Sequence, residues 1–220
     1  MSGNGAEPFA AERFAMVERQ LRPRGIHDER VLTAMYKVPR HEFVDRESWK
    51  EAYADHPVAI GEQQTTSQPY MIAVMIQAAQ IKPEDRVLEI GAGSGYQTAL
   101  LAELASQVFA VERYTSLAET AGKALERLGY RNVKVTAGDG SLGLPEAAPF
   151  DAIIVSAAAP RVPPALIEQL APGGRLVIPV GDSQEQVVQL VQRDLDGNIT
   201  VRTLEGCRFV PLIGQQGFAA

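Results

Sequence analysis

Short apolar segments alternate with longer segments of helical spacing over residues 86–181. The strand-like runs are RVLEI (86–90), VFAVE (108–112), NVKVTAGDG (132–140), FDAIIVSAA (150–158) and GRLVIPVG (174–181). Between them, apolar residues such as Leu117, Ala121 and Leu125 recur with the period of an amphipathic helix. Strands that alternate with helices are typical of a parallel sheet covered by helices on both faces. We therefore expect an α/β fold.

The segments on either side of this core follow other patterns. Before it, helical spacing predicts one helix with Phe14, Val17 and Leu21 inward, one from Asp28 to about Lys37, and one from about Gln68 with Met71, Val74, Met75 and Ala78 inward. After it, two strand-like runs flank an Asp-Gly turn at Asp196 to Asn198, which is typical of a hairpin. We expect an N-terminal helical cap and a C-terminal antiparallel hairpin on an otherwise parallel sheet.

The length of 220 residues suits a single domain. We divide it into a flexible tail (1–12), the helical cap (13–80), a cofactor-binding core (81–181), and the hairpin with a substrate-cleft segment (182–220). The sequence contains no heptad pattern that would require a partner helix. We therefore expect a monomer.

The composition disfavours several classes of protein. Three histidines and the single Cys207 lie far apart in the sequence, so neither a metal site nor a disulfide is expected. A net charge of −6 disfavours a surface that holds nucleic acid. The N-terminus lacks the features of a signal peptide, and no apolar run approaches the roughly 20 residues that span a bilayer. We expect a cytoplasmic protein that does not bind a membrane.

A glycine-rich loop follows the first core strand. Glu89 and Ile90 lead into Gly91, Ala92, Gly93, Ser94 and Gly95, where a strand must turn into a helix. Glycine allows the backbone to approach a ligand closely, and the helix N-terminus offers unpaired N–H groups. The GxGxG spacing differs from the GxGxxG of dinucleotide-binding proteins, and no P-loop lysine follows. The loop indicates a nucleotide-like ligand, and a tight connection without a ligand is the alternative.

Acidic residues end the next two strands. Glu112 lies 19 residues beyond Gly93, where a carboxylate can accept both ribose hydroxyls of an adenosine. Asp139 and Gly140 end the third strand, where the carboxylate could accept from an adenine amine and glycine gives room for the ring. A solvated carboxylate and a plain turn are the alternatives. Three strand ends that face one crevice favour an adenosine site.

These residues resemble the S-adenosylmethionine-dependent methyltransferases, which have a Rossmann-like seven-stranded, mostly parallel sheet. The resemblance implies S-adenosyl-L-methionine as cofactor, S-adenosyl-L-homocysteine as product, and a role for Glu89 in holding the methionine ammonium. We also assign Thr65, Thr66, Ser67 and Arg113 to the cofactor site.

Motifs that the sequence lacks restrict the class of methyl acceptor. The fourth strand ends in DAIIVSAAAP rather than the Asn/Asp-Pro-Pro-Tyr/Phe of many enzymes that methylate nucleobase amines. Cys207 lies in an apolar strand and is interpreted as a packed thiol. A carboxylate acceptor requires neither a metal nor a base, because it is already an anion at neutral pH.

Five segments closely resemble the protein-L-isoaspartate O-methyltransferase family. They are residues 16–44, 61–79, 86–102, 148–160 and 208–214, so the resemblance covers about 14–214. It implies methyl transfer to the α-carboxyl of L-isoaspartyl residues in damaged proteins and peptides, with D-aspartyl residues as poorer substrates. The ester then cyclises to a succinimide, whose hydrolysis restores some normal aspartate.

The resemblance also implies the substrate site. Ser67 matches the family's active-site serine, although it could equally cap the following helix. Val210, Pro211 and Leu212 resemble the segment that lines the peptide cleft. Thr66 differs from the isoleucine of many relatives. The alternatives are a methyltransferase that acts on a small molecule or nucleic acid, a nicotinamide oxidoreductase, and a non-catalytic binding module.

Overall fold

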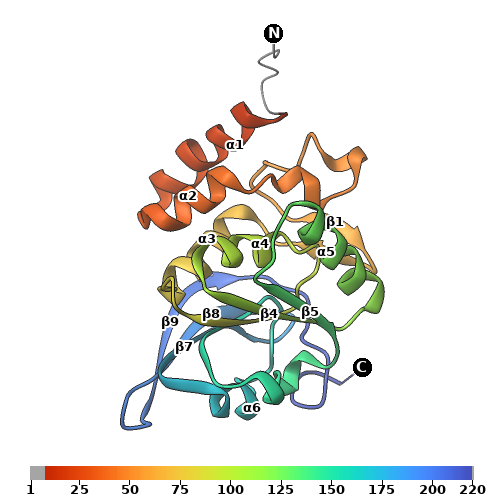
Figure 1. Cartoon of the computed structure of the whole chain (residues 1–220). Helices are drawn as coiled ribbons and strands as arrows, with labels where there is room; N and C mark the ends of the chain where they lie inside the picture. Colours follow the sequence, from red (N-terminus) through yellow and green to blue (C-terminus); the bar gives the residue numbers. More distant parts are fainter. Residues whose placement is uncertain (1–7, 220) are drawn as a thin grey trace.

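A seven-stranded sheet forms the centre of the computed structural model, which describes residues 8–219 (Figure 1). Its strands are β3 (Arg86–Ile90), β4 (Gln107–Glu112), β5 (Val133–Ala137), β6 (Phe150–Val155), β7 (Leu170–Gly181), β8 (Gln186–Arg193) and β9 (Ile199–Cys207). They lie in the order β5-β4-β3-β6-β7-β8-β9. Strands β3 to β7 are parallel to one another. Strand β8 pairs antiparallel with β7, and β9 pairs antiparallel with β8. The expected mostly parallel sheet with a C-terminal hairpin is confirmed.

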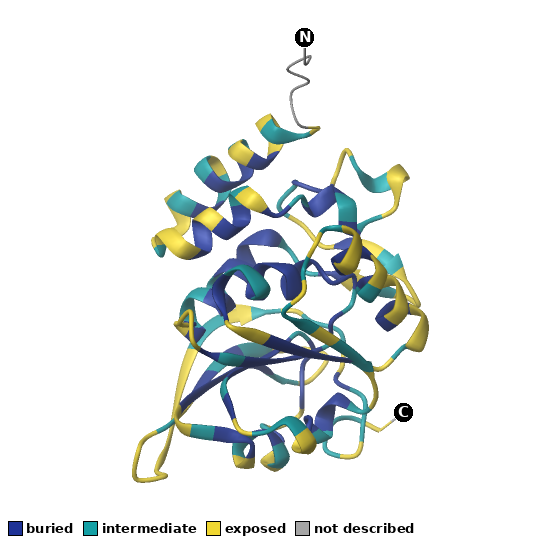
Figure 2. Ribbon diagram, viewed as in Figure 1, coloured by how far each residue is buried: buried dark blue, intermediate teal, exposed yellow. Residues whose placement is uncertain are grey.

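The central strands are buried on both faces, as their continuous apolar sequences require. On β3, Val87 faces the core cluster on the side of the N-terminal helices, and Leu88 faces the cluster on the opposite side. Both residues are fully buried. Figure 2 shows this pattern as dark blue strands between the helices, with exposed residues on the outer helices and the β8–β9 hairpin. Two packed layers therefore fix the ends of β3, β4 and β6.

Helices cover both faces of the sheet. Helices α3 (Pro69–Ala79), α4 (Tyr96–Leu104) and α5 (Thr115–Arg127) cover one face of the sheet, and α1 (Ala10–Met16) and α2 (Glu29–Lys37) lie outside α3 and α4. Helix α6 (Pro164–Glu168) lies on the opposite side of the sheet (Figure 1). Short helical turns complete the chain: η1 (Val17–Leu21), η2 (Arg22–Arg24), η3 (Arg40–Phe43), η4 (Arg46–Ser48), η5 (Gly140–Leu142) and η6 (Pro145–Ala147).

The first helix differs from its prediction. It begins at Ala10, inside the expected tail 1–12, of which residues 1–7 lie outside the described part of the chain. After Met16 it continues as a π-helix, whose wider turn shifts the buried face. Val17 and Leu21 are therefore buried as expected, but Phe14 is 59% exposed.

The third helix has a wider buried surface than predicted. Met71 and Met75 are buried as expected, whereas Val74 and Ala78 are only partly buried. Ile72 and Ile76, which the prediction left out, are almost fully buried. The reason is the position of α3 between the sheet and the N-terminal helices, because a helix with neighbours on several sides buries most of its circumference.

The segment expected to be wholly helical also contains a β-hairpin. Strands β1 (Val58–Gly61) and β2 (Gln64–Thr66) pair antiparallel, with Val58 opposite Thr66. The residues between them, Glu62 and Gln63, both have positive φ angles of 49° and 57°. Such a turn normally contains glycine or asparagine at its two central positions, so Glu62 and Gln63 do not indicate a turn.

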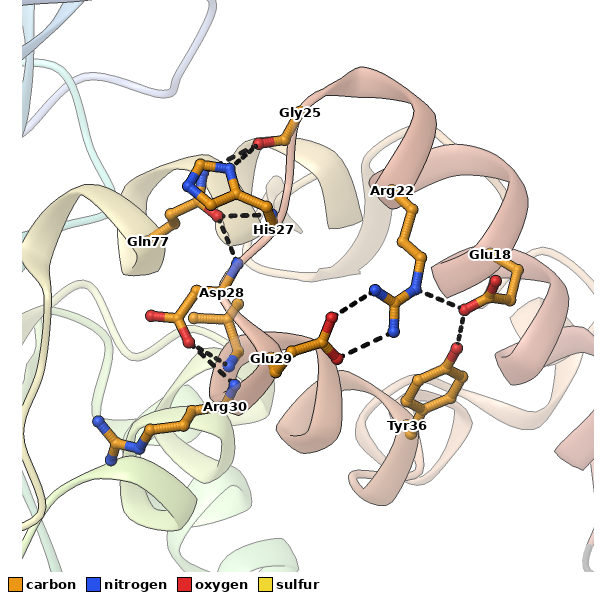
Figure 3. A network of polar contacts seen from close by, with 10 residues as sticks. Glu18, Arg22, Gly25, His27, Asp28, Glu29, Arg30, Tyr36 and Gln77 are labelled. Atoms are coloured by element: carbon orange, nitrogen blue, oxygen red, sulfur yellow. Dashed lines mark hydrogen bonds and ion pairs between the residues drawn. The ribbon is translucent and has the colours of Figure 1, made fainter.

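Polar contacts join the N-terminal helices to α3 and to one another (Figure 3). The Gln77 side-chain oxygen accepts from the N–H groups of His27 and Asp28 at 2.8 and 3.0 Å. The Asp28 carboxylate in turn accepts from the N–H of Arg30 at 2.9 Å and begins α2 as its N-cap. These contacts fix the N-terminal helices relative to the core. None of the helices within residues 8–219 is long and apolar enough to span a bilayer.

Candidate active site

The glycine-rich loop connects β3 to α4 at the carboxyl end of the parallel strands. Gly93 has a φ of 54°, and a Cβ there would lie 3.2 Å from Cδ1 of Ile60 on the β1–β2 hairpin. Gly95 has a φ of 89°, and a Cβ there would lie 3.1 Å from Cβ of Ala121 on α5. Both positions therefore need glycine, for conformation and for space. The loop is held between a hairpin on one side and a helix on the other.

Glu112 ends β4 beside this loop, as the sequence predicted. Its Oε2 accepts from the N–H of Gly93 at 2.8 Å, and its Oε1 accepts from the N–H of Tyr114 at 3.0 Å. The residue is buried, with 6% of its surface exposed. Since each carboxylate oxygen has two lone pairs, both oxygens retain the capacity to accept from a ligand hydroxyl.

Glu89 at the end of β3 is fully buried and has no cationic partner among residues 8–219. Its two oxygens accept from Nε2 of Gln97 at 3.0 Å and from Oγ1 of Thr98 at 2.5 Å. Burial, and secondarily the charge of Glu112, raise the pKa of Glu89 to about 8, although the two hydrogen bonds act in the opposite direction. Near neutral pH the group therefore holds a proton, and an incoming cation would favour the ionised carboxylate.

Three hollows meet at this end of the sheet. The first, which we call the sheet-edge cavity, has a volume of about 140 Å³. It is lined by Gln64, Thr65, Ile90, Gly91, Gly93, Val111, Glu112, Arg113, Tyr114, Gly140, Ser156, Ala157, Val210, Pro211, Leu212 and Ile213. A smaller glycine-loop cavity is lined by Ser67, Glu89, Gly91, Ala92, Gly93 and Ser94, among others. An open cleft includes Ser67, Met71, Cys207 and Val210.

Thr65 and Ser156 line all three hollows. Ser156 directly follows β6, and its Oγ accepts from Nε2 of Gln97 at 2.8 Å. Gln97 therefore bridges Ser156 and Glu89. Sequence reasoning missed Ser156 and Gln97. Ser156 follows a buried strand that pairs with β3, but a serine in that position is common, so the sequence contains no distinctive signal for it.

Ser67 lies between β2 and α3 and faces both the glycine-loop cavity and the open cleft. The N-cap of α3 is Gln68, and no side chain caps this helix. The alternative role of Ser67 as a capping residue is therefore wrong. Among the described residues its hydroxyl has no hydrogen-bond partner, so it is available to a ligand.

Thr66 and Arg113 occupy different surroundings from one another. Thr66 lines the glycine-loop cavity, but its hydroxyl accepts a hydrogen bond from buried Arg40 at 3.3 Å. Arg113 is exposed and lines the sheet-edge cavity from the loop after β4. Their contact with a cofactor stays a prediction.

Asp139 and Gly140, which follow β5, line different hollows. Gly140 lines the sheet-edge cavity, whereas Asp139 lines a neighbouring hollow together with Arg113. The Asp139 carboxylate accepts from the N–H of Ser141 at 2.9 Å and from the N–H of Gln215 at 2.8 Å. Burial alone would raise its pKa, but these amides and the Ser141 hydroxyl lower it overall. In this structure Asp139 fastens the C-terminal segment, and its expected adenine contact stays a prediction.

The C-terminal segment forms one wall of the site. Val210 accepts from the N–H of Ala158 at 2.8 Å, and the N–H of Leu212 donates to the Ala158 carbonyl at 2.7 Å. Pro211 lies between them and has no N–H to donate. Val210 lines both the sheet-edge cavity and the open cleft, so this segment separates the two hollows.

The histidines and the cysteine lie outside this arrangement or at its margin. His41 is buried and its Nδ1 lies 2.8 Å from the Tyr53 hydroxyl, whereas His56 is exposed. Cys207 is half-buried in the open cleft, and burial followed by the charge of Glu205 raises the pKa of its thiol to about 11. Within residues 8–219, no three His, Cys, Asp or Glu side chains are grouped to hold a metal ion.

The fold and the site together define a class of protein. A parallel sheet with a glycine loop after its central strand, and a cavity at the carboxyl ends of the strands, is the Rossmann-like arrangement of a methyltransferase. A solved protein-L-isoaspartate O-methyltransferase has the same fold, with a TM-score of 0.83 and 29% identity over 94% of this chain and 67% of that chain. A β-aspartate methyltransferase of Plasmodium falciparum in complex with S-adenosyl-L-homocysteine has a TM-score of 0.79 and 28% identity over 90% of this chain and 97% of that chain.

Sequence comparison identifies the family within this class. The protein-L-isoaspartate O-methyltransferase of Koribacter versatilis is 54% identical over 211 residues, which cover 96% of this chain and 95% of the relative. The enzyme of the same description from Methanoculleus marisnigri is 53% identical over 214 residues, or 97% and 96% of the two chains. The family model of protein-L-isoaspartate(D-aspartate) O-methyltransferase matches residues 12–217. The chain belongs to this family.

Proposed function

We propose that this chain transfers a methyl group from S-adenosyl-L-methionine to the α-carboxyl of L-isoaspartyl residues in damaged proteins and peptides. Relatives more than 50% identical over nearly the whole chain bear this description, and a solved neighbour is in complex with S-adenosyl-L-homocysteine. The methyl ester would begin repair through a succinimide. D-aspartyl residues would be a poorer substrate of the same site.

The side chains at the strand ends fit such a cofactor. Glu112 retains lone pairs for the ribose hydroxyls, because each of its oxygens accepts only one backbone hydrogen bond. Glu89 is a buried carboxyl without a cation, which suits the methionine ammonium. Gly140 and Ile90 line the sheet-edge cavity side by side, and a Cβ at position 140 would lie 2.4 Å from Cγ2 of Ile90, so this wall of the cavity needs glycine.

The cofactor would supply a methyl group on a positively charged sulfur. An oxygen of the substrate carboxylate would form the new bond to the methyl carbon, and the electrons of the broken sulfur–carbon bond would remain on sulfur. No proton is transferred, so the site needs no general base. The task of the protein is to align an anion with the methyl carbon and to exclude water from the pair. The free hydroxyl of Ser67 would orient the carboxylate.

One observation carries this proposal. The sheet-edge cavity, the glycine-loop cavity and the open cleft meet at Thr65 and Ser156, with Ser67 on the border between the last two. The residues of the two cavities would hold a cofactor beside this junction. A peptide in the open cleft would approach the same point from solvent. The methyl group and its acceptor would therefore meet beside Ser67.

The test is transfer of labelled methyl groups to an isoaspartyl peptide and to its normal aspartyl twin. We expect a base-labile ester on the isoaspartyl peptide alone. Label on neither peptide, or on both equally, would refute the proposal. Label on RNA or on small molecules in a parallel assay would favour the alternative acceptors.

We further propose that the chain acts in the cytoplasm as a monomeric, single methyltransferase domain on protein substrates, and not on nucleic acid or at a membrane. The net charge of −6 supports the exclusion of nucleic acid, because phosphate backbones bind to basic surfaces. Light scattering would give the mass of the particle in solution, and a dimer would refute the monomer.

A further inference from the structure

Arg40 is the largest side chain that is fully buried in the described structure. It lies at the start of η3, and its guanidinium donates three hydrogen bonds. Nε donates to the carbonyl of Ala52 at 2.6 Å, Nη1 to Oγ1 of Thr66 at 3.3 Å, and Nη2 to the carbonyl of Ser67 at 2.9 Å. Two of these three acceptors belong to the segment that carries the candidate active-site serine.

This buried charge has no acidic partner within residues 8–219, since none of the ion pairs there includes Arg40. Its acceptors are neutral oxygens, and its other neighbour is the ring of Tyr96, with a distance of 4.7 Å from Cζ to the ring centroid. A buried arginine without a carboxylate is costly to desolvate. An apolar residue of similar size would fill the same space, so packing alone does not account for an arginine.

Tyr96 connects Arg40 to the glycine-rich loop. Tyr96 directly follows Gly95 and begins α4, the helix that leaves the glycine-rich loop. The planar guanidinium therefore contacts the Ser67 segment through its hydrogen bonds and the glycine loop through the Tyr96 ring. One rigid group links the residue placed to orient the acceptor to the loop placed to hold the cofactor.

We propose that Arg40 is a positioning residue for methyl transfer, which fixes the Thr66–Ser67 backbone relative to the start of α4. The kinetic part of this inference rests on the proposed function, whereas the ordering of the Thr66–Ser67 segment does not. Arg40 touches neither acceptor nor cofactor and acts through the Ser67 segment. A displacement of about 1 Å in such a segment can reduce turnover by about a hundredfold.

Two substitutions test the proposal at different strengths. Arg40→Lys keeps the positive charge but loses the fork that reaches three acceptors at once. Thr66→Val has nearly the same shape as the native residue and removes only the hydroxyl that accepts from Nη1. Arg175→Lys is the matched control. Arg175 is also a buried arginine and donates to the carbonyls of Ala79 and Gln80, but it pairs with Asp85 and lines none of the three hollows.

The first measurement is hydrogen exchange of the backbone amides over residues 62–70, which needs no substrate. We expect faster exchange in Arg40→Lys, a smaller increase in Thr66→Val, and no local change in Arg175→Lys. Unchanged exchange over this segment in both test variants would overturn the proposal. If Arg40→Lys does not fold, Thr66→Val provides the same test.

The second measurement is a double-mutant cycle on turnover of an isoaspartyl peptide, at a temperature where all variants are folded. Arg40→Lys should lower kcat by about tenfold to a hundredfold in the native background. In a Ser67→Ala background it should lower kcat less than threefold further, because the residue through which it acts is already changed. Equal losses in both backgrounds would indicate general damage and overturn the proposal. If the native chain methylates no isoaspartyl peptide, the proposed function fails, and the exchange experiment still decides the role of Arg40.

Discussion

Ser67 combines a free hydroxyl with a fixed backbone. Its carbonyl accepts from Arg40, whereas its side chain faces two hollows and takes no part in capping α3. A hydroxyl without a nearby imidazole base is not activated as a nucleophile. Within residues 8–219, none of the three histidines, His27, His41 and His56, lines any of the three hollows. Orientation of a substrate carboxylate is therefore the role that fits its surroundings.

Ser67→Ala should lower kcat for an isoaspartyl peptide by about tenfold to a hundredfold, because an aligned acceptor is lost. The affinity for S-adenosyl-L-homocysteine should change little, since Ser67 lies between β2 and α3 and outside the sheet-edge cavity that contains Glu112. Steady-state kinetics and titration calorimetry measure the two effects. The exposed Ser183, in the turn before β8, provides a control substitution to alanine. Equal loss of turnover and affinity would contradict this role.

Glu112→Ala should act mainly on the cofactor. Removal of a charged acceptor for the ribose should weaken S-adenosyl-L-homocysteine binding by about 1.5 to 3 kcal/mol, or roughly tenfold to 150-fold. Calorimetry measures the affinity. Glu119→Ala on the exposed surface of α5 is the control and should bind as the native chain does. An unchanged affinity for Glu112→Ala would exclude a ribose contact.

Glu89 should make stability and binding depend on pH. Burial raises its pKa from 4.5 to about 8, so between these values the folded chain holds a proton that the unfolded chain releases. The free energy of unfolding of the ligand-free chain should therefore fall as the pH rises from about 5 to 8. Glu89→Gln, which remains neutral, should lose this dependence. Denaturant titration at several pH values measures it, and the same slope in both proteins would contradict the assignment.

Binding of a cationic ammonium beside Glu89 should release that proton near pH 7, because the cation favours the carboxylate. Calorimetry in two buffers of different ionisation enthalpy would show this as a difference in the heat of binding. The difference should be smaller in Glu89→Gln.

At the scale of elements, the β1–β2 hairpin packs against the glycine loop. Ile60 approaches Gly93, and Gln64 and Thr65 line the sheet-edge cavity. The tip of the hairpin is fixed by a hydrogen bond of 2.6 Å from the Ser116 hydroxyl of α5 to the Glu62 carboxylate. The hairpin thus links the glycine loop to α5 and fixes their relative positions beside the candidate cofactor site.

Gln63→Gly should stabilise this hairpin. Gln63 is exposed and has a φ of 57°, which costs a residue with a side chain more than it costs glycine. The expected gain is about 1 kcal/mol, or a rise of roughly 2 to 4 °C in Tm for a chain of this length. Gln184→Gly, in a turn without positive φ, should instead lower Tm slightly. Thermal unfolding measures both, and a lower Tm for Gln63→Gly would contradict the argument.

The elements differ in how far the sequence predicts them. The core strands were predictable because burial on both faces leaves continuous apolar runs. The starts of α2 and α3 were predictable because Asp28 is a preferred N-cap residue and Pro69 suits the first turn of a helix. The β1–β2 hairpin was not, since Glu62 and Gln63 adopt a glycine-like turn without glycine. Phe14 was assigned to the wrong face because local spacing does not reveal a π-helical turn.

At the scale of the whole molecule, the site is assembled from segments far apart in the sequence. Glu89 and Glu112 were predictable, because strand order places the ends of adjacent parallel strands together. Ser156 carries no such signal, since a serine after a buried strand is common and its importance comes from the hollows around it. Arg40 lies more than twenty residues before Ser67, and only tertiary packing brings its guanidinium to that carbonyl.

The wall formed by Val210 to Ile213 closes the candidate cofactor site with a segment that lies far from the glycine loop in the sequence. The contact between the Gln215 N–H and the Asp139 carboxylate holds this wall beside the sheet-edge cavity. A protease that cuts between β9 and this wall would leave the strands and the glycine loop in place but would open the cavity. Loss of cofactor binding would then report a cut at this point in a chain whose sheet is still folded.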